Sequence, residues 1–203
     1  MRSVFRSALN AELLNGDGAR GLIERFKPTD TLRRDAQVET LAFLSEHEDA
    51  FQRDCDEGHL TASGIIVDAS LSRTLLLFHP LYERWQQPGG HADGDTNLVR
   101  VALRESIEET GMADLKIWPE IVDVAVASGE GSRPHLHFDV RFLVFAQTVS
   151  EEPVSPEGLR LRWFKRDELI EPDISCRRRL MIEDAFALAR ELVSDPEVHP
   201  DGR

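Results

Sequence analysis

Three glutamates in one short segment have the chemistry and the spacing to bind a cation. Glu105, Glu108 and Glu109 stand at positions i, i+3 and i+4 of a stretch that reads as a helix, so their carboxylates share one face. Like charges at this spacing cost roughly 0.2–0.5 kcal/mol for each close pair. A hard divalent cation would remove that cost and use the oxygens as ligands. The alternative is an acidic helix face exposed to solvent, and the glutamates alone do not separate the two.

The predicted helix that carries these glutamates runs from about Thr96 to Thr110. The residues of its core-facing side recur at helical spacing: Leu98, Ala102, Leu103, Ser106 and Ile107. We expect Asp95 or Thr96 to cap the helix at its start, and Gly111 suits a left-handed cap at its end. The glutamates would then lie at the edge of a packed core, next to a cleft.

The residues around this helix make a cation site more specific. Gly89 and Gly90 follow Pro88 and allow the backbone to come close to a ligand. Arg104 could pair with a nearby carboxylate and orient it. A Gly-Gly turn, a loop and a helix bearing Arg-Glu-x-x-Glu-Glu-x-Gly together favour a metal site over a solvated face.

The segment from Gly90 to Met112 resembles the Nudix box, G-x5-E-x7-R-E-U-x-E-E-x-G-U, in which U is a bulky apolar residue. Seven of the nine specified positions match, namely Gly90, Arg104, Glu105, Glu108, Glu109, Gly111 and Met112. Thr96 stands where the family has its first Glu, and Ser106 stands where it has its first apolar residue. Neither departure touches the three glutamates, so the change at Thr96 questions the loop geometry more than metal binding.

The resemblance implies hydrolysis of a nucleoside diphosphate linked to another moiety, with water attacking a phosphorus atom. It implies that Glu105, Glu108 and Glu109 ligate Mg²⁺ or Mn²⁺, with the Gly89 carbonyl as an extra ligand and Arg104 in support. A cation so held bridges phosphate oxygens and lowers the pKa of the attacking water. Many enzymes of this family place a further ligand or a catalytic base in the loop that corresponds to Glu157. The alternative for Glu157 is a solvated loop acid, and Glu130 is a weaker candidate for the same role.

A predicted strand from His135 to Thr148 offers further pocket residues. His135, His137, Asp139 and Arg141 alternate with apolar residues that face the core. The histidines or Arg141 could touch phosphate or base, and a second metal site of His-x-His-x-Asp type is conceivable but unneeded; the alternative is a solvated sheet face.

Residues near the box offer weaker candidates for substrate contacts. His91 could position the loop or contact substrate. We expect Trp85 to be a core residue rather than a base-stacking one. Arg84 and Arg133 are more simply surface arginines than phosphate ligands.

The order of elements predicts an α/β/α sandwich on a mixed β-sheet. Strand-like runs are expected at Ala62–Asp68, Thr74–His79, Trp85–Pro88, Ile121–Ala127, His135–Thr148 and Leu161–Phe164, and a final helix at about Ser175–Val193. Residues 1–56 read as a helical N-terminal extension, whose longer helix opens near Pro28 and Thr29. Residues 57–203 read as the catalytic domain, and the extension could form a homodimer interface or a lid over the pocket.

Composition narrows the class of protein. The chain has 203 residues and a formal net charge of −13, and an acidic surface repels nucleic-acid polymers. Its two cysteines, Cys55 and Cys176, form neither a metal motif nor a disulfide framework, which is typical of free thiols in a reducing cytoplasm. The sequence lacks a signal-peptide pattern and a run of about 18 apolar residues, so we expect a cytoplasmic protein without a membrane span.

Three functions compete for this pattern. The leading hypothesis is a metal-dependent pyrophosphohydrolase acting on a nucleotide-type small molecule whose identity the sequence leaves open. A non-catalytic sensor or interaction module is the alternative, but the presence of all three glutamates favours catalysis. An isoprenyl diphosphate isomerase would need a cysteine near the pocket, and Cys55 and Cys176 lie outside the predicted core strands.

Overall fold

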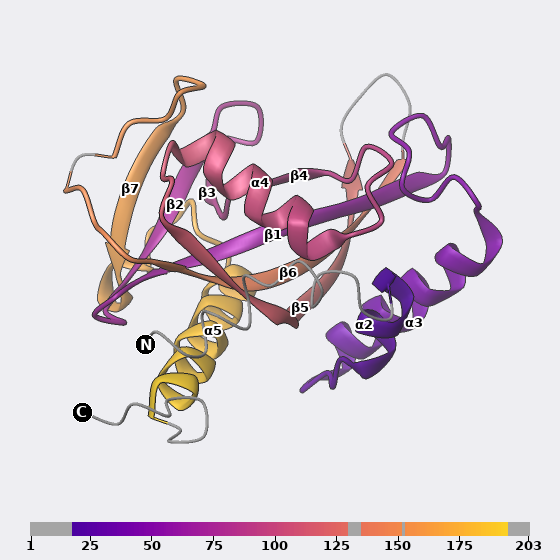
Figure 1. The fold of residues 1–203 in the computed structure, drawn as a ribbon, viewed down its shortest axis with the longest axis horizontal. Coiled ribbons are helices and arrows are strands. Elements are labelled where there is room, and N and C mark those ends of the chain that lie inside the picture. The colour runs from indigo at the N-terminus through magenta and orange to yellow at the C-terminus, as the bar shows by residue number, and fades with distance from the viewer. Residues whose placement is uncertain (1–17, 130–134, 152, 195–203) are drawn as a thin grey trace.

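A mixed seven-stranded sheet forms the centre of the molecule (Figure 1). The computed structural model describes residues 18–129, 135–151 and 153–194. Five strands follow one another in the order β3-β2-β1-β6-β5, while β4 pairs with β1 and β7 pairs with β2. The strands are β1 (Gly58–Asp68), β2 (Arg73–His79), β3 (Arg84–Gln86), β4 (Gly89–His91), β5 (Leu115–Gly129), β6 (His135–Ala146) and β7 (Arg160–Lys165).

The parallel pair of β1 and β6 is the centre of this sheet. Eleven residues of β1, from Gly58 to Asp68, are opposite eleven of β6, from Leu136 to Ala146. Every residue of β1 is buried, as expected of a strand covered on both faces. The other pairs of strands are antiparallel, so the mixed sheet expected from the sequence is confirmed.

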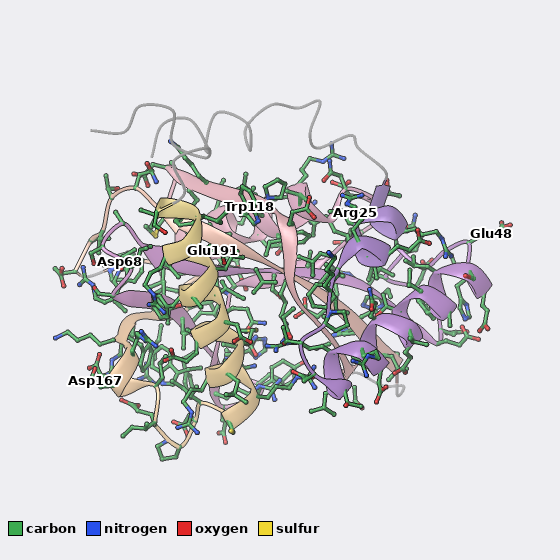
Figure 2. The ribbon with its side chains drawn as sticks, turned by 90° about the horizontal axis from the view of Figure 1, so that it is seen from below. Arg25, Glu48, Asp68, Trp118, Asp167 and Glu191 are labelled. Carbon is green, nitrogen blue, oxygen red and sulfur yellow. The ribbon has the colours of Figure 1, made fainter. Side chains whose placement is uncertain are left out.

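Helices cover both faces of the sheet. The helix α4 (Leu98–Thr110) buries Leu98, Val101 and Ala102 against alternate residues of β1 and β6. The helix α5 (Cys176–Ser194) buries Met181, Ile182, Ala185 and Phe186 against the intervening residues, among them Ile65 and Leu143. The predicted α/β/α sandwich is therefore confirmed, and Figure 2 shows α5 lying across its own face of the sheet.

The N-terminal helices share the core of the sheet. The helices are α2 (Gly18–Arg25) and α3 (Thr31–Glu46), and Asp30 caps α3 by accepting a hydrogen bond from the Arg33 amide. On α3 the Phe43 ring stacks on Phe138 of β6, with ring centroids 4.1 Å apart. The expected helices before residue 18 lie outside the described residues, and the division of the chain at residue 57 stays a prediction.

Two elements differ from those expected, the strand β5 and the start of the helix α4. β5 begins at Leu115 rather than Ile121, with register shifts between Ile117 and Asp123. The N-cap of α4 is Asn97, which accepts from the Arg100 amide, and not Asp95 or Thr96. Asp95 instead accepts from the Asn97 amide and pairs with the Arg100 guanidinium. Gly111 caps the helix in the left-handed conformation as predicted, with φ of 69°.

In the described residues no helix has the length and apolar composition to cross a membrane.

Candidate active site

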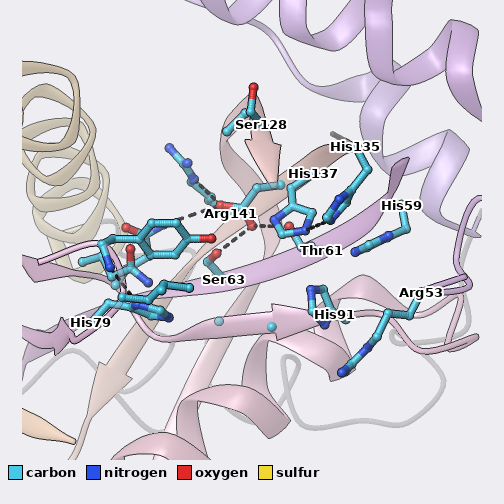
Figure 3. A pocket seen from close by; sticks show the side chains of 18 of the residues that line it. Arg53, His59, Thr61, Ser63, His79, His91, Ser128, His135, His137 and Arg141 are labelled. Atoms are coloured by element: carbon cyan, nitrogen blue, oxygen red, sulfur yellow. Dashed lines mark hydrogen bonds and ion pairs between the residues drawn. The ribbon is translucent and has the colours of Figure 1, made fainter. Parts of the chain in front are cut away.

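The principal pocket lies on the α5 side of the sheet, beyond the part that α5 covers. Along β1 this face carries Ile65 and Val67 beneath α5, and then Ser63, Thr61 and His59 towards the other end. The change from apolar to polar side chains opens a cavity of about 760 Å³, lined by β1, β4, β6 and residues that follow α3 (Figure 3).

The first of the three carboxylates, Glu105, is held by its neighbours. Arg104 Nη2 donates to Glu105 Oε1 at 2.8 Å and to the backbone oxygen of His91 at 3.1 Å, so Arg104 ties the helix to β4 as well as orienting the carboxylate. The Gly90 backbone lies directly against the same carboxylate, and a Cβ at this position would overlap it. Burial raises the pKa of Glu105 despite its ion pair with Arg104.

The second carboxylate, Glu109, lines the pocket. Its Oε2 accepts a hydrogen bond of 2.8 Å from the Gly89 amide. The pKa of Glu109 is raised to about 8, chiefly by burial and to a smaller extent by the charges of Glu105, Glu157 and Glu108, against the lowering effect of the Gly89 amide. Glu108 is 55% exposed, and its Oε2 lies 4.0 Å from Arg104 Nε. The helix therefore presents three carboxylates to one another, and burial makes the charge of two of them unfavourable.

The loop between β4 and α4 is positioned by the segment that follows α3. Arg53 pairs with Asp93 through two hydrogen bonds of 3.0 and 2.8 Å. The Gly94 amide donates to the Phe51 carbonyl at 2.7 Å. The chain before residue 57 thus helps to set the shape of the loop that precedes the glutamate helix.

A polar network forms the floor of the pocket. The parallel register places Thr61 opposite Asp139 and Ser63 opposite Arg141. Asp139 accepts from Ser63 at 2.6 Å, Thr61 at 3.1 Å and Arg141 at 2.6 Å, and Arg141 also donates to Asp123 at 2.7 Å. Burial opposes ionisation of Asp139, but Arg141 and the hydroxyls hold its pKa below the usual value. Arg141 lies in the pocket lining as expected, with its guanidinium already engaged by two carboxylates.

Four histidines form the wall at the other end of the pocket. His135 and His137 lie there as the alternation of β6 predicted, and His91 joins them from β4. His59 on β1 is the member that the sequence analysis missed; its ring lies 4.7–5.2 Å, centroid to centroid, from the other three. Burial lowers the pKa of both His59 and His137 to about 4, so these imidazoles are neutral at physiological pH.

A second residue missed from the sequence, Arg178, enters the pocket from α5. Its Nε donates to Gln87 Oε1 at 3.2 Å. Burial and the nearby charges of Arg141 and Arg84 lower the pKa of Arg178 to about 9. A half-buried guanidinium facing like charges favours an anion. The only signal in the sequence was the run Arg177-Arg178-Arg179 at the start of the last helix, which periodicity alone does not assign to a pocket.

Comparison with known proteins agrees with the geometry of the glutamate helix. The NUDIX domain family model matches residues 57–184, which is more than half of the chain. The chain belongs to the Nudix family. A search of curated proteins found no significant match to this sequence.

Solved Nudix structures share the fold. A Nudix-family hydrolase from Clostridium perfringens is 18% identical, with a TM-score of 0.53 over 64% of this chain and 97% of that one. An Ap4A hydrolase from C. elegans is 16% identical, with a TM-score of 0.53 over 65% of this chain and 98% of that one. At these identities the likeness concerns the fold alone.

The remaining residues that the sequence singled out lie in the loop before β7, in the core, in the pocket lining or outside the described residues. Glu157 is exposed in the loop before β7, and its charge contributes to the raised pKa of Glu109. Trp85 is buried in the core against Phe164, as expected. Arg84 lines the pocket, whereas Glu130 and Arg133 lie outside the described residues.

One cysteine lies closer to the pocket than its place in the sequence suggested. Cys55 is buried and lines the pocket, because the segment after α3 folds against β1 and the loop after β4. Burial raises the pKa of its thiol, so Cys55 is not an activated nucleophile. Isomerase chemistry is therefore disfavoured by the state of this thiol rather than by distance from the pocket.

Proposed function

We propose that the protein is a Mg²⁺- or Mn²⁺-dependent pyrophosphohydrolase that cleaves a nucleoside diphosphate linked to another moiety. The observation that carries the proposal is Glu109, a half-buried carboxylate that accepts a hydrogen bond from the Gly89 amide beside Glu105 at a polar pocket. A carboxylate that burial drives towards its neutral form gains most from a cation.

The donor set fits a hard divalent cation. Glu105, Glu108 and Glu109 supply oxygen ligands, and the Gly89 carbonyl is a candidate for a further one. When bound, the cation would offset negative charge on the phosphates and lower the pKa of the attacking water. Arg104 keeps Glu105 in place through its 2.8 Å ion pair and braces β4 through the His91 carbonyl. Glu157, whose charge acts on Glu109 from the loop before β7, is the candidate for the base that takes the proton of the water.

In this proposal, substrate is bound by two arginines, Arg178 and Arg84, and by His91. Arg178 and Arg84, which repel one another across the pocket, would each pair with a phosphate oxygen and so relieve that repulsion. His91 lies between the loop and the cavity, where it can donate to substrate or fix the loop. Arg141, His135 and His137 line the same cavity, and we assign Arg141 to holding the pocket floor, since both Asp139 and Asp123 already engage it.

A product analysis tests the proposal. Purified protein is incubated with Mg²⁺ and a panel comprising ADP-ribose, nucleotide sugars, dinucleoside polyphosphates, coenzyme A and modified nucleoside triphosphates, and phosphate or nucleoside monophosphate release is measured. We expect at least one compound to be cleaved, and Glu108→Gln to lower kcat/KM by about 100-fold or more.

Glu39→Gln provides a matched control, because Glu39 is exposed on α3, away from the pocket. It should retain full activity. Binding of a panel compound without turnover would instead support a non-catalytic sensor. An active Glu108→Gln enzyme would remove the glutamates from the chemistry.

A further inference from the structure

The imidazole wall brings three ligand atoms together. One nitrogen each of His59, His135 and His137 lies within 4.8 Å of the others, and the two Nε2 atoms of His135 and His137 are 3.0 Å apart. The register of the sheet produces this cluster, because His59 of β1 lies opposite His137 of β6. Figure 3 shows the three rings converging at the end of the pocket remote from His79.

His59 is the most unusual member of the cluster. Its side chain is 2% exposed, and among the described residues neither Nδ1 nor Nε2 has a hydrogen-bond partner. A neutral imidazole carries one N–H donor and one acceptor nitrogen, and leaving these buried and unpaired is unfavourable. A ligand at the centre of the cluster would satisfy the acceptor nitrogen.

Gly129 makes room for the cluster. The residue lies opposite His135 at the end of β5, and a Cβ there would overlap His135 Nε2 and come within 2.7 Å of His137 Nε2. The φ of Gly129 is not in the left-handed region, so its backbone conformation does not require glycine. The two rings lie across the glycine backbone, which places both nitrogens towards His59.

We propose that His59, His135 and His137 form a second metal site, specific for a borderline transition-metal ion such as Zn²⁺ and separate from the carboxylates of α4. Imidazole nitrogens suit such ions, whereas Mg²⁺ prefers oxygen ligands. Tetrahedral zinc with Zn–N bonds of about 2.0–2.1 Å places its nitrogens about 3.3 Å apart. The nitrogens of His135 and His137 are already 3.0 Å apart, and that of His59 lies within 4.8 Å of both. The fourth position faces the pocket, where it can accept an oxygen of water or substrate.

Cobalt(II) provides a probe of this site that does not depend on activity. The full chain is stripped with a chelator and titrated with Co²⁺, and the visible absorption of tetrahedral cobalt is recorded. We expect one equivalent to produce this spectrum in the wild type and in Glu108→Gln. His59→Gln and His137→Gln should weaken cobalt binding by at least about 100-fold, since even outer-shell changes at metal sites cost 10–100-fold.

Three control variants assign the signal. His79→Gln changes a histidine that lines the pocket beside Tyr82, outside the cluster, and should leave the cobalt spectrum unchanged. Cys55→Ser tests a competing group, His47, Cys55 and Glu57, whose ligand atoms also lie within 4.8 Å of one another. Gly129→Ala should weaken cobalt binding while every ligand is retained, and circular dichroism checks that each variant is folded.

Several outcomes would overturn the proposal. Absence of a tetrahedral spectrum in the wild type is one, and an unchanged spectrum in both His59→Gln and His137→Gln is another. Loss of the signal in Glu108→Gln would place the ion on the carboxylates, and loss in Cys55→Ser would place it on the cysteine group. Cobalt binding and pyrophosphate cleavage are measured separately, so a negative cobalt result leaves the proposed hydrolase activity standing, and a negative product analysis leaves the imidazole site standing.

Discussion

The carboxylate edge (Glu105, Glu108 and Glu109) reaches the pocket through Glu109, and the imidazole wall (His59, His91, His135 and His137) lines the other end of the same pocket. The two are built in different ways. The edge comes from two successive turns of one helix, whereas the wall is assembled from β1, β4 and β6. Burial acts on both in the same sense: it raises the pKa of Glu109 to about 8 and lowers that of His59 to about 4. Burial thus favours the neutral form in both sets, although their charged forms, carboxylate and imidazolium, have opposite signs.

The wall and the edge also differ in the residues that hold them in place. The polar network of the pocket floor, next to the wall, includes Asp123, which pairs with Arg33 of α3. Arg33 Nε lies 2.6 Å from Asp123 Oδ1, and Arg33 Nη2 lies 2.7 Å from Asp184 of α5. The edge is instead supported locally, by Arg104 and by the Gly89 and Gly90 backbone. The N-terminal helices therefore matter to the wall more than to the edge.

The largest expected effect comes from breaking that support. Arg33→Leu should lower the free energy of unfolding by about 3–5 kcal/mol, because it leaves Asp123 buried with one fewer cation. Urea denaturation measures this loss. Arg34→Leu, which changes the adjacent exposed arginine, should cost no more than about 0.5 kcal/mol, and equal losses in the two variants would contradict the role of the buried pair.

The next effect concerns the edge alone. Glu109→Gln keeps an oxygen that can accept from the Gly89 amide but removes a metal ligand, so kcat/KM with Mg²⁺ should fall by about 100- to 1000-fold. Thermal denaturation should show no loss of stability, since a buried carboxyl with a raised pKa is replaced by a neutral amide. A variant that is destabilised yet fully active would reverse this assignment.

Arg178→Gln tests the basic side of the pocket. We expect KM to rise by about 10- to 100-fold, because a charge-assisted hydrogen bond to phosphate contributes about 1.5–3 kcal/mol. Stability should not fall, since the repulsion of Arg178 by Arg141 and Arg84 is removed. Steady-state kinetics on the substrate found in the panel, with Arg179→Gln alongside, make the measurement; a similar KM in both variants would exclude Arg178 from phosphate binding.

The smallest predicted effect is the pH dependence of the edge. Glu109 has a pKa of about 8 and is mostly protonated below it, whereas a cation requires the ionised carboxylate. The affinity for Mg²⁺ should therefore rise between pH 6 and pH 8, by at most about tenfold per pH unit, and level off above pH 8. Isothermal titration in buffers of different ionisation enthalpy should detect up to about one proton released per ion at pH 7. In Glu109→Gln this proton release should disappear, and its persistence would identify another group as the source.

Local spacing allowed the sequence to determine the carboxylate edge. Residues at i, i+3 and i+4 meet on any helix, so Glu105, Glu108 and Glu109 needed no knowledge of the rest of the fold. The period of two along β6 likewise placed His135, His137, Asp139 and Arg141 on one face and the apolar residues on the other. Nearly all of the predicted strands and the mixed sheet followed from the same periodicities.

The tertiary structure alone decided which distant residues complete the pocket. His59 and His137 are 78 positions apart in the sequence, and they lie side by side because the parallel strands β1 and β6 pair in one register. That register depends on the whole core rather than on either strand. Arg178 and Cys55 enter the pocket because α5 and the segment after α3 pack against the sheet, and no pattern within those segments encodes the direction in which they pack. The sequence by itself determined the carboxylates of one helix and the polar face of one strand, whereas long-range packing decided what stands opposite them.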